Sequence, residues 1–357
     1  ARRLEEIPWI VIYASAGSHP LTGVQSGTTA HRQDNIDVFV FAKFCYNLST
    51  RPLDRNHIDS PPLVTADNIG TVRATYIDNY VLRDMTDLGN HLNSAKENGF
   101  NAVMLDFKTK DGLLTYDSNL ISYSGDEEYI EIDSQIINKI KSEGFLLLGR
   151  IYCFEDTIAP QRLNAYIYED LEKTRIWFDD SAIMNGKVWL DPTNSKSTNY
   201  LCSVIKEVVS MGVDCIYLDS VQFPESRPGA VPVYTSDDTT LNRNMILMKF
   251  IEKAVSSTSG RPVILGCPSE CADGGNTEKW GGTLFDTAAN ICSPVLEAPQ
   301  NGEFISYIEN SYLVLNNKAK NNFSTVKIIP TIKNPVENTE FYENLASSEA
   351  QSYIIVP

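Results

Sequence analysis

The stretch Gly212-Val-Asp-Cys-Ile-Tyr-Leu-Asp219 carries the clearest structural signal in the sequence. Its central run from Cys215 to Leu218 is apolar throughout, which is typical of a strand buried on both faces of a parallel sheet. A helical pattern from about Thr198 to Met211 precedes it, and Gly212 suits the left-handed position that ends a helix. Helix, glycine, buried strand and terminal carboxylate together indicate one unit of an alternating α/β fold.

The same alternation extends in both directions, from residue 71 to residue 357. The expected helices end near glycines or short polar turns and cover Leu82–Asn98, Ile130–Glu143, Thr198–Met211 and Leu241–Ser257. The expected strands are short β-branched runs at Val72–Ile77, Ala102–Phe107, Phe145–Phe154, Cys215–Asp219, Pro262–Cys267, Asn290–Leu296, Val326–Thr331 and Ser352–Val356. Eight strands alternating with helices predict an α/β fold, a (β/α)₈ TIM barrel over residues 66–357. An open, doubly wound sheet is the structural alternative.

Residues 1–65 do not follow this rhythm. They contain two strand-like runs, Trp9–Ala14 and Asp37–Phe44, separated by a stretch rich in glycine, serine and threonine. Pro61-Pro62 is typical of a linker. We therefore expect a small N-terminal β-rich extension ahead of the barrel.

The composition restricts the possible partners. Of the 357 residues, 42% are hydrophobic and 21% charged, as in an ordinary globular protein with a large core. The formal net charge of −16 repels phosphate backbones, so we expect no nucleic acid, and a carbohydrate substrate remains open. No apolar run reaches the roughly 20 residues that cross a bilayer. The alternative interpretation is that the acidic surface only keeps the protein soluble, and oligomeric state is not predicted.

The seven cysteines have no spacing typical of a disulfide framework. Cys153, Cys215 and Cys267 lie in or at the end of apolar runs, where cysteine behaves as a small hydrophobic residue. Cys267 and Cys271 are close enough in sequence to pair, and this pairing stays open.

The histidines exclude several kinds of barrel chemistry. They are His19, His31, His57 and His91, and none stands at the end of an expected strand. A zinc hydrolase needs histidine ligands at such positions, and a Ser-His-Asp triad needs a histidine beside its nucleophile. The sequence also lacks the glycine-rich phosphate-binding motifs. We therefore expect no metal and no cofactor, and a chemistry based on carboxylates.

Carboxylates follow most of the middle strands, at the end where a barrel places its active site. They are Asp106, Glu155, Asp156, Asp219, Glu270 and Glu297. Glycoside hydrolysis needs two carboxyl groups in different protonation states. Asp219 is the candidate for the ionised group, because it ends the most apolar strand. Glu270, in the turn Cys267-Pro-Ser-Glu-Cys271, is the candidate proton donor, since partial burial there would raise its pKa.

Other residues near strand ends are candidates for binding a sugar. Asp106 and Lys108 lie two apart in one strand, so they should share a face and either bind hydroxyls or form an ion pair. Arg150 is expected beside Tyr152 and needs a carboxylate partner, which Asp106 or Asp219 could supply. Aromatic residues in the following loops could stack on pyranose rings or only anchor their loops; they are Trp177, Trp189, Phe223 and Trp280. Glu155, Asp156 and Glu297 complete the expected substrate-binding set.

Several motifs together resemble the putative glycosyl hydrolase domain family of bacterial (β/α)₈ proteins, which is related in pattern to the α-amylase-like clan. They are Asn101-Ala-Val-Met-Leu-Asp-Phe-Lys108 with Asp111-Gly112 and Tyr116, Gly149-Arg-Ile-Tyr-Cys-Phe-Glu-Asp156, Trp189-Leu-Asp-Pro192 with Tyr200, and Gly212 to Pro224. The resemblance implies a barrel and a carbohydrate substrate. It also implies a nucleophilic Asp after strand four and an acid/base Glu after strand five, roles that would fall on Asp219 and Glu270.

The sequence departs from this family at one motif. Where the family tends to have Asp-Tyr-x-Arg-Phe-Pro, this chain has Asp219-Ser-Val-Gln-Phe-Pro224, without the Tyr and the Arg. Three hypotheses follow: a glycoside hydrolase that cleaves a poly- or oligosaccharide, a catalytically impaired carbohydrate-binding barrel, and a structural protein of the cell envelope. An extracellular or cell-envelope location accompanies all three as an expectation.

Overall fold

The computed structural model describes residues 68–120, 130–181, 184–227, 229–236, 242–268, 277–282, 289, 291–297, 304–321, 326–333, 335 and 339–357. All of them belong to one compact unit, Pro62–Pro357. The expected N-terminal extension and its boundary near residue 65 lie outside the described residues, as does Glu270.

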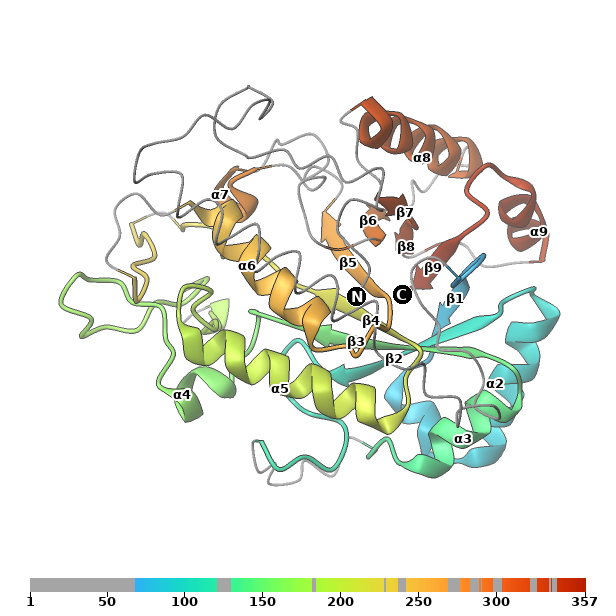
Figure 1. Ribbon diagram of the computed structural model, residues 1–357, viewed down its shortest axis with the longest axis horizontal. Helices are drawn as coiled ribbons and strands as arrows, with labels where there is room; N and C mark the ends of the chain where they lie inside the picture. The colour runs from blue at the N-terminus through green and yellow to red at the C-terminus, as the bar shows by residue number, and fades with distance from the viewer. Residues whose placement is uncertain are drawn as a thin grey trace, which may run out of the picture. The chain divides into compact units, whose positions relative to one another are not determined.

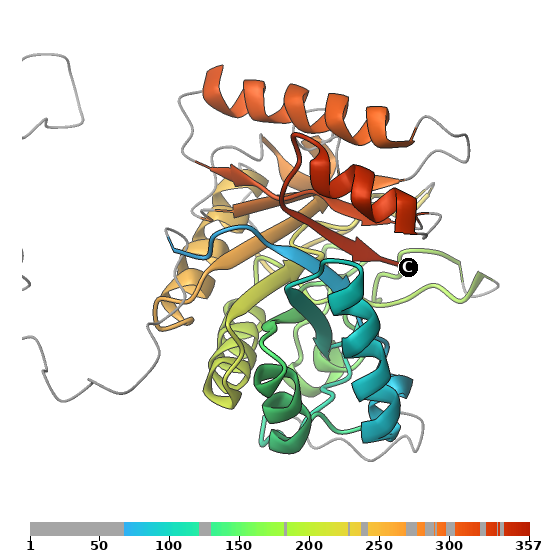
Figure 2. The same cartoon turned by 90° about the vertical axis from the view of Figure 1, so that its right-hand side faces the viewer.

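The described strands form a closed parallel barrel, which confirms the (β/α)₈ prediction and excludes the open sheet (Figure 1). They are β1 Arg73–Tyr76, β2 Ala102–Lys108, β3 Leu146–Tyr152, β4 Cys215–Asp219, β5 Val263–Pro268, β6 Ile291–Glu297, β7 Lys327–Ile328, β8 Thr331–Lys333 and β9 Tyr353–Val356. Neighbours pair in the order β5-β4-β3-β2-β1-β9-β8-β6-β7, and the additional β5–β6 pairing closes the ring. Figure 2 shows β9 and β1 side by side, where the last strand meets the first.

One expected strand is divided. The run Val326–Thr331 forms β7 and β8, and both pair with β6. Pro330 lies between them and has no amide hydrogen to donate to a sheet ladder. The two short strands together therefore occupy one position in an eight-stranded barrel.

Helices connect the strands and cover the outside of the barrel. They are η2 Asn79–Arg83, α2 Met85–Glu97, α3 Ser134–Ser142, α4 Ala159–Leu163, α5 Ser195–Met211, α6 Arg243–Ser256, α7 Thr277–Trp280, α8 Phe304–Asn321 and α9 Thr339–Ser347. The expected helix from Leu82 begins at Met85, because the Asp84 side chain accepts a hydrogen bond from the Thr86 amide and caps the helix there. Asp133 caps α3 in the same way.

Strand alternation divides the apolar residues between two cores. Residues such as Ala74, Met104, Leu148 and Ile264 fill the barrel interior, whereas their neighbours in each strand pack outward against the helices. Towards the carboxyl ends the interior becomes polar, and the candidate site begins there.

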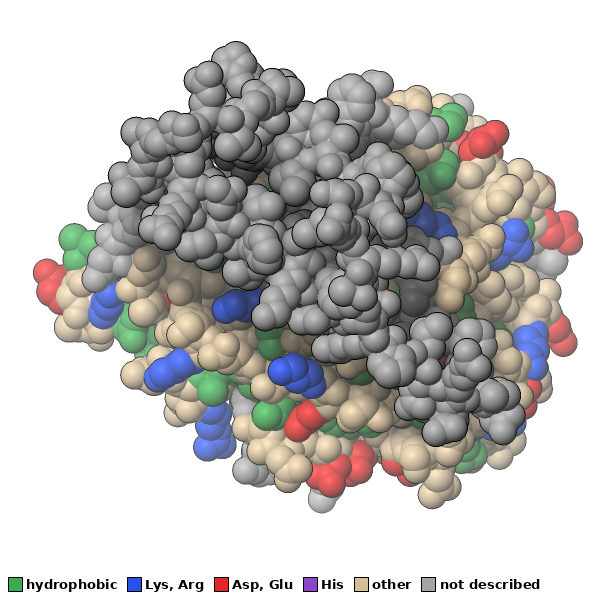
Figure 3. All heavy atoms as spheres, in the orientation of Figure 1, with side chains coloured by type: hydrophobic (Ala, Val, Ile, Leu, Met, Phe, Trp, Pro, Cys, Tyr) green, Lys and Arg blue, Asp and Glu red, His purple; other side chains and the backbone are tan. Residues whose placement is uncertain are grey.

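Among the described residues, no helix has both the length and the apolar character that a membrane span requires. On the face in Figure 3, the described acidic and basic side chains are interspersed instead of forming a patch of one sign.

Candidate active site

A nearly buried arginine between two tyrosines forms the base of the barrel mouth. Arg150, from β3, donates through Nε and Nη2 to the carboxylate of Asp106 on β2, and the Nη2–Oδ2 distance is 2.9 Å. The Tyr76 hydroxyl donates to the same carboxylate at 3.0 Å. The guanidinium lies 4.7 Å from the Tyr76 ring centroid and 4.9 Å from that of Tyr152. Of the two partners expected for Arg150, the structure therefore shows Asp106 in contact and not Asp219.

Asp219 stands at the end of β4, half-buried beside this arginine. Its Oδ1 accepts a hydrogen bond from the Ser220 amide at 2.7 Å. Burial raises the pKa of Asp219, and the charges of Arg150 and Lys110 partly oppose that rise. Asp219 opens into a cavity of about 470 Å³, whose other lining residues include Gln222, Gly266, Pro268, Glu297 and Tyr307.

Ser220 joins Asp219 to a second carboxylate. Its backbone is left-handed, with φ 50°, and its hydroxyl donates to Glu155 Oε2 at 3.2 Å. Lys110 Nζ lies 3.0 Å from the other oxygen of Glu155. Burial raises the pKa of Glu155, Lys110 opposes the rise, and the charge of Asp219 adds to it. The charge of Asp219 therefore disfavours ionisation of Glu155 across one serine.

Lys108 and Asp106 do not share a face as expected. The register of β2 against β3 shifts between them, and this irregularity breaks the alternation of side chains. Lys108 Nζ instead forms an ion pair with Asp156 Oδ2 at 2.8 Å, although the two groups are not aligned for a hydrogen bond. The same Nζ donates a hydrogen bond to the Tyr152 carbonyl at 2.7 Å. Both charged side chains are 0% exposed. Neither Lys108 nor Asp156 has an exposed atom with which to touch a sugar, so their contribution to the mouth is structural.

All four expected aromatic platforms are also buried. Trp177 and Phe223 are 0% exposed and Trp280 is 1% exposed. Trp177 donates from Nε1 to the Ala230 carbonyl at 3.0 Å, as a loop anchor does. Trp189 is only 7% exposed, but it lines a second hollow together with Glu155, and its Nε1 donates to Asp179. Of these four aromatic residues, Trp189 is the one that lines this hollow.

The remaining expected residues are placed as follows. Glu297, at the end of β6, is exposed in the same cavity as Asp219 and lies 3.4 Å from Lys333. Tyr152 is half-buried over Arg150. Within the described residues, no group of three His, Cys, Asp or Glu side chains could hold a metal ion.

Sequence reasoning missed four residues of the mouth, namely Tyr76, Lys110, Ser220 and Gln222. A signal existed for Tyr76, which is the next-to-last residue of the expected strand Val72–Ile77, and for Ser220 and Gln222, which lie in the motif that begins with Asp219. No local signal indicated that Lys110 would reach Glu155.

The chain is similar to known proteins at the level of family and of fold. A family model described as "Putative glycosyl hydrolase domain" matches residues 74–267, which contain Asp106, Arg150, Glu155 and Asp219. No curated protein matches the chain.

Among solved structures, the barrel of this chain is similar to that of the Kfla1895 D451A mutant in complex with cyclobis-(1->6)-alpha-nigerosyl. The TM-score is 0.53 at 10% identity, over 85% of this chain and 44% of that one. A hypothetical protein from Ruminiclostridium thermocellum matches with TM-score 0.45 and 21% identity, over 54% of this chain and 96% of that one. Alpha-L-fucosidase isoenzyme 2 from Paenibacillus thiaminolyticus matches with TM-score 0.46 and 14% identity, over 79% and 49%. The chain thus spans less than half of the mutant and about half of the fucosidase.

Proposed function

We propose that this chain, which belongs to the putative glycosyl hydrolase domain family, hydrolyses a glycosidic bond in a poly- or oligosaccharide with Asp219 as its ionised carboxylate. One observation carries the proposal: Asp219 is a half-buried aspartate at the carboxyl end of β4, and it faces a cavity large enough for a sugar.

The mechanism needs two carboxyl groups with different tasks. Asp219 attacks the anomeric carbon, or removes a proton from the attacking water, while the second carboxyl protonates the departing glycosidic oxygen. Arg150 and the Ser220 amide favour the charged form of Asp219, which keeps it available for that task. Glu270 remains our proposal for the proton donor, because it follows β5 and β5 pairs with β4.

Glu155 is the second candidate for the proton donor, so the experiment must distinguish it from Glu270. With Glu270→Gln, we expect kcat on a natural glycan to fall about 10²-fold, and much less on an aryl glycoside whose leaving group needs no proton. Glu155→Gln should leave this dependence on the leaving group unchanged. Steady-state kinetics on both substrate types checks this. A loss in Glu155→Gln that an activated leaving group restores would transfer the donor role to Glu155.

The pH dependence of the reaction follows from the raised pKa of Asp219. The ionised form is the active one, so kcat/KM should fall as the pH decreases through that pKa. The decline should therefore be centred above the ordinary aspartate value of 3.8. Removing the neighbouring positive charge with Lys110→Met should move the decline to higher pH, because the charge of Lys110 favours ionisation of Asp219. A pH profile of kcat/KM measures both effects, and a decline in the same place for both proteins would count against the coupling.

A panel of soluble glycans tests the function itself, with reducing ends measured over days for the wild type and Asp219→Asn. Products from the wild type alone would support hydrolysis. A second candidate function, glycan binding without cleavage, is favoured by Gln222, which stands where the family tends to have an arginine and lines the cavity beside Asp219. That function requires saturable binding and no products from either protein.

A further inference from the structure

We propose that the cavity at Asp219 is one end of a groove that binds an extended glycan chain, so that the enzyme cleaves internal bonds of a polysaccharide. This rests on the proposed function and adds the substrate class and the mode of attack.

Three neighbouring hollows share lining residues. The cavity at Asp219 shares Gln222 with a second hollow of about 500 Å³, which Glu155 and Trp189 also line. The second hollow shares Asp180 and Asn185 with a third of about 510 Å³, which Phe178 lines. Each has the size of an ordinary small-ligand site, about 300–1,000 Å³. A single sugar at Asp219 would leave the other two hollows empty, whereas a chain fills all three.

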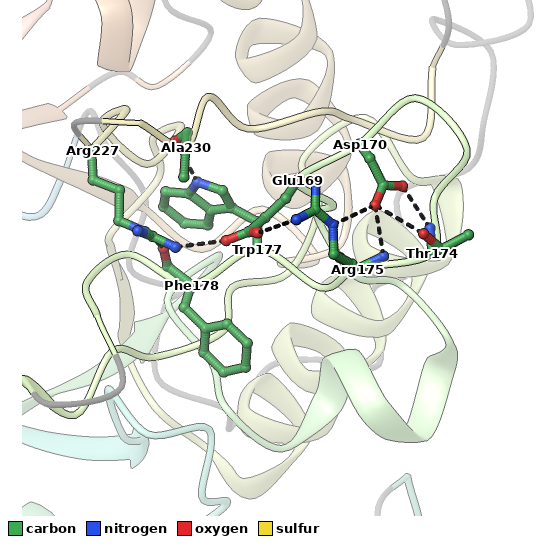
Figure 4. Close-up of polar contacts among 8 residues, drawn as sticks. All are labelled: Glu169, Asp170, Thr174, Arg175, Trp177, Phe178, Arg227 and Ala230. Carbon is green, nitrogen blue, oxygen red and sulfur yellow. Dashed lines mark hydrogen bonds and ion pairs between the residues drawn. The ribbon is translucent and has the colours of Figure 1, made fainter.

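The wall of the third hollow is held by a dense polar network (Figure 4). Arg227 donates to Glu169 Oε1 at 2.6 Å and to the Phe178 carbonyl at 2.9 Å. Trp177, the neighbour of Phe178 in sequence, anchors the same segment by donating a hydrogen bond to the Ala230 carbonyl. Figure 4 shows the Phe178 ring turned away from the Arg227–Glu169 pair, and Phe178 is 39% exposed. A wall that is already ordered loses little freedom when a ligand binds.

The junction between the second and third hollows depends on a glycine. A Cβ at Gly186 would lie 2.1 Å from the Asp180 carbonyl oxygen, so only glycine permits this close approach. The tight loop places Asn185 on the border of both hollows. Amide and carboxylate groups between two aromatic side chains, Trp189 and Phe178, suit a chain of pyranose rings with hydroxyls along its edges.

The charges of the groove point to a glycan without dense acidic groups. Each lysine that lines the second hollow is close to a carboxylate: Lys110 to Glu155, Lys187 to Asp111 and Lys279 to Glu225. The net charge of −16 also repels a polyanion.

The test measures binding as a function of chain length. Malto-, isomalto-, cello- and chito-oligosaccharides, from disaccharide to octasaccharide, are titrated into Asp219→Asn by calorimetry, so that cleavage does not interfere. We expect the affinity for one series to rise with length. In the Asp219→Asn background, Phe178→Ala should weaken binding of the octasaccharide about tenfold and leave the disaccharide unchanged. Leu171→Ala is the matched control, because Leu171 is an exposed apolar residue of the same stretch of sequence as Phe178 and lines none of the three hollows.

The outcomes test the binding groove and the hydrolysis reaction separately. Equal affinity for short and long chains, equal weakening of both by Phe178→Ala, or no binding in any series would overturn the groove. Length-dependent binding without products from the wild type would support the groove and remove the hydrolase function. Where the wild type does cleave, a mixture of intermediate lengths early in the reaction supports internal attack, and products released only from a chain end overturn it.

Discussion

An Asp219→Asn variant should lose glycan hydrolysis by about 10³-fold or more in kcat, while its folded structure is kept. An amide cannot act as the nucleophile or general base that the reaction requires. Asparagine has nearly the same shape, and its side-chain oxygen can still accept the hydrogen bond from the Ser220 amide. Burial already disfavours the charge of Asp219, so replacing it with a neutral group removes no stabilising ionisation. Initial rates on the glycan that the wild type cleaves, with circular dichroism to check folding, measure this result.

Asp214→Asn is the matched control for that experiment. Asp214 precedes β4 at the opposite end of the same strand, where it lies 3.1 Å from Lys141 and accepts a hydrogen bond from the Leu147 amide at 2.9 Å. Its replacement should lower the unfolding midpoint and leave kcat unchanged. Equal losses of kcat in the two variants would mean that Asp219 acts through the stability of the barrel, and undiminished turnover in Asp219→Asn would remove it from the mechanism.

The sequence predicted those parts of the fold that depend on local pattern. The run Cys215–Asp219 forms β4 with the bounds expected, because a short apolar run that follows a helix-ending glycine is typical of a strand buried on both faces. The division at Pro330 was missed, although proline itself was a visible signal. Helix starts were placed a few residues early where a capping aspartate, such as Asp84 or Asp133, fixes the first turn.

The candidate site could be predicted only to the level of strand ends. Asp219 and Arg150 occupy the mouth because alternation within a strand determines which residues face inward. The register shift after Asp106 depends on how β2 pairs with β3, so no local pattern indicated that Lys108 would leave the mouth. The burial of Trp177 depends on a segment more than fifty residues away in sequence, at Ala230, and no local pattern predicts such a contact.

The buried ion pair between Lys108 and Asp156 should have the largest effect on stability. It takes the place of the contact that the sequence predicted between Lys108 and Asp106. Lys108→Met should reduce the free energy of unfolding by about 3–5 kcal/mol, because it leaves the carboxylate of Asp156 buried without a counter-charge. Asp156 cannot turn to water, since its Oδ1 accepts from the Ile158 and Ala159 amides and Gly112 packs directly against it. Methionine fills most of the lysine's volume, so a cavity adds little to the loss. Denaturant unfolding followed by fluorescence measures the change.

Lys110→Met is the matched control, because Lys110 is two residues away and pairs with Glu155 while its own side chain is 55% exposed. Its loss should change the free energy of unfolding by no more than about 1 kcal/mol. In Lys108→Met, the second substitution Asp156→Asn should restore part of the stability, since asparagine is neutral and its side-chain oxygen can still accept from the same two amides. Similar values for Lys108→Met and Lys110→Met, or no recovery in the double variant, would mean that the charge of Asp156 is relieved in another way. The buried Lys108–Asp156 pair would then contribute far less to holding the mouth of the barrel than its burial indicates.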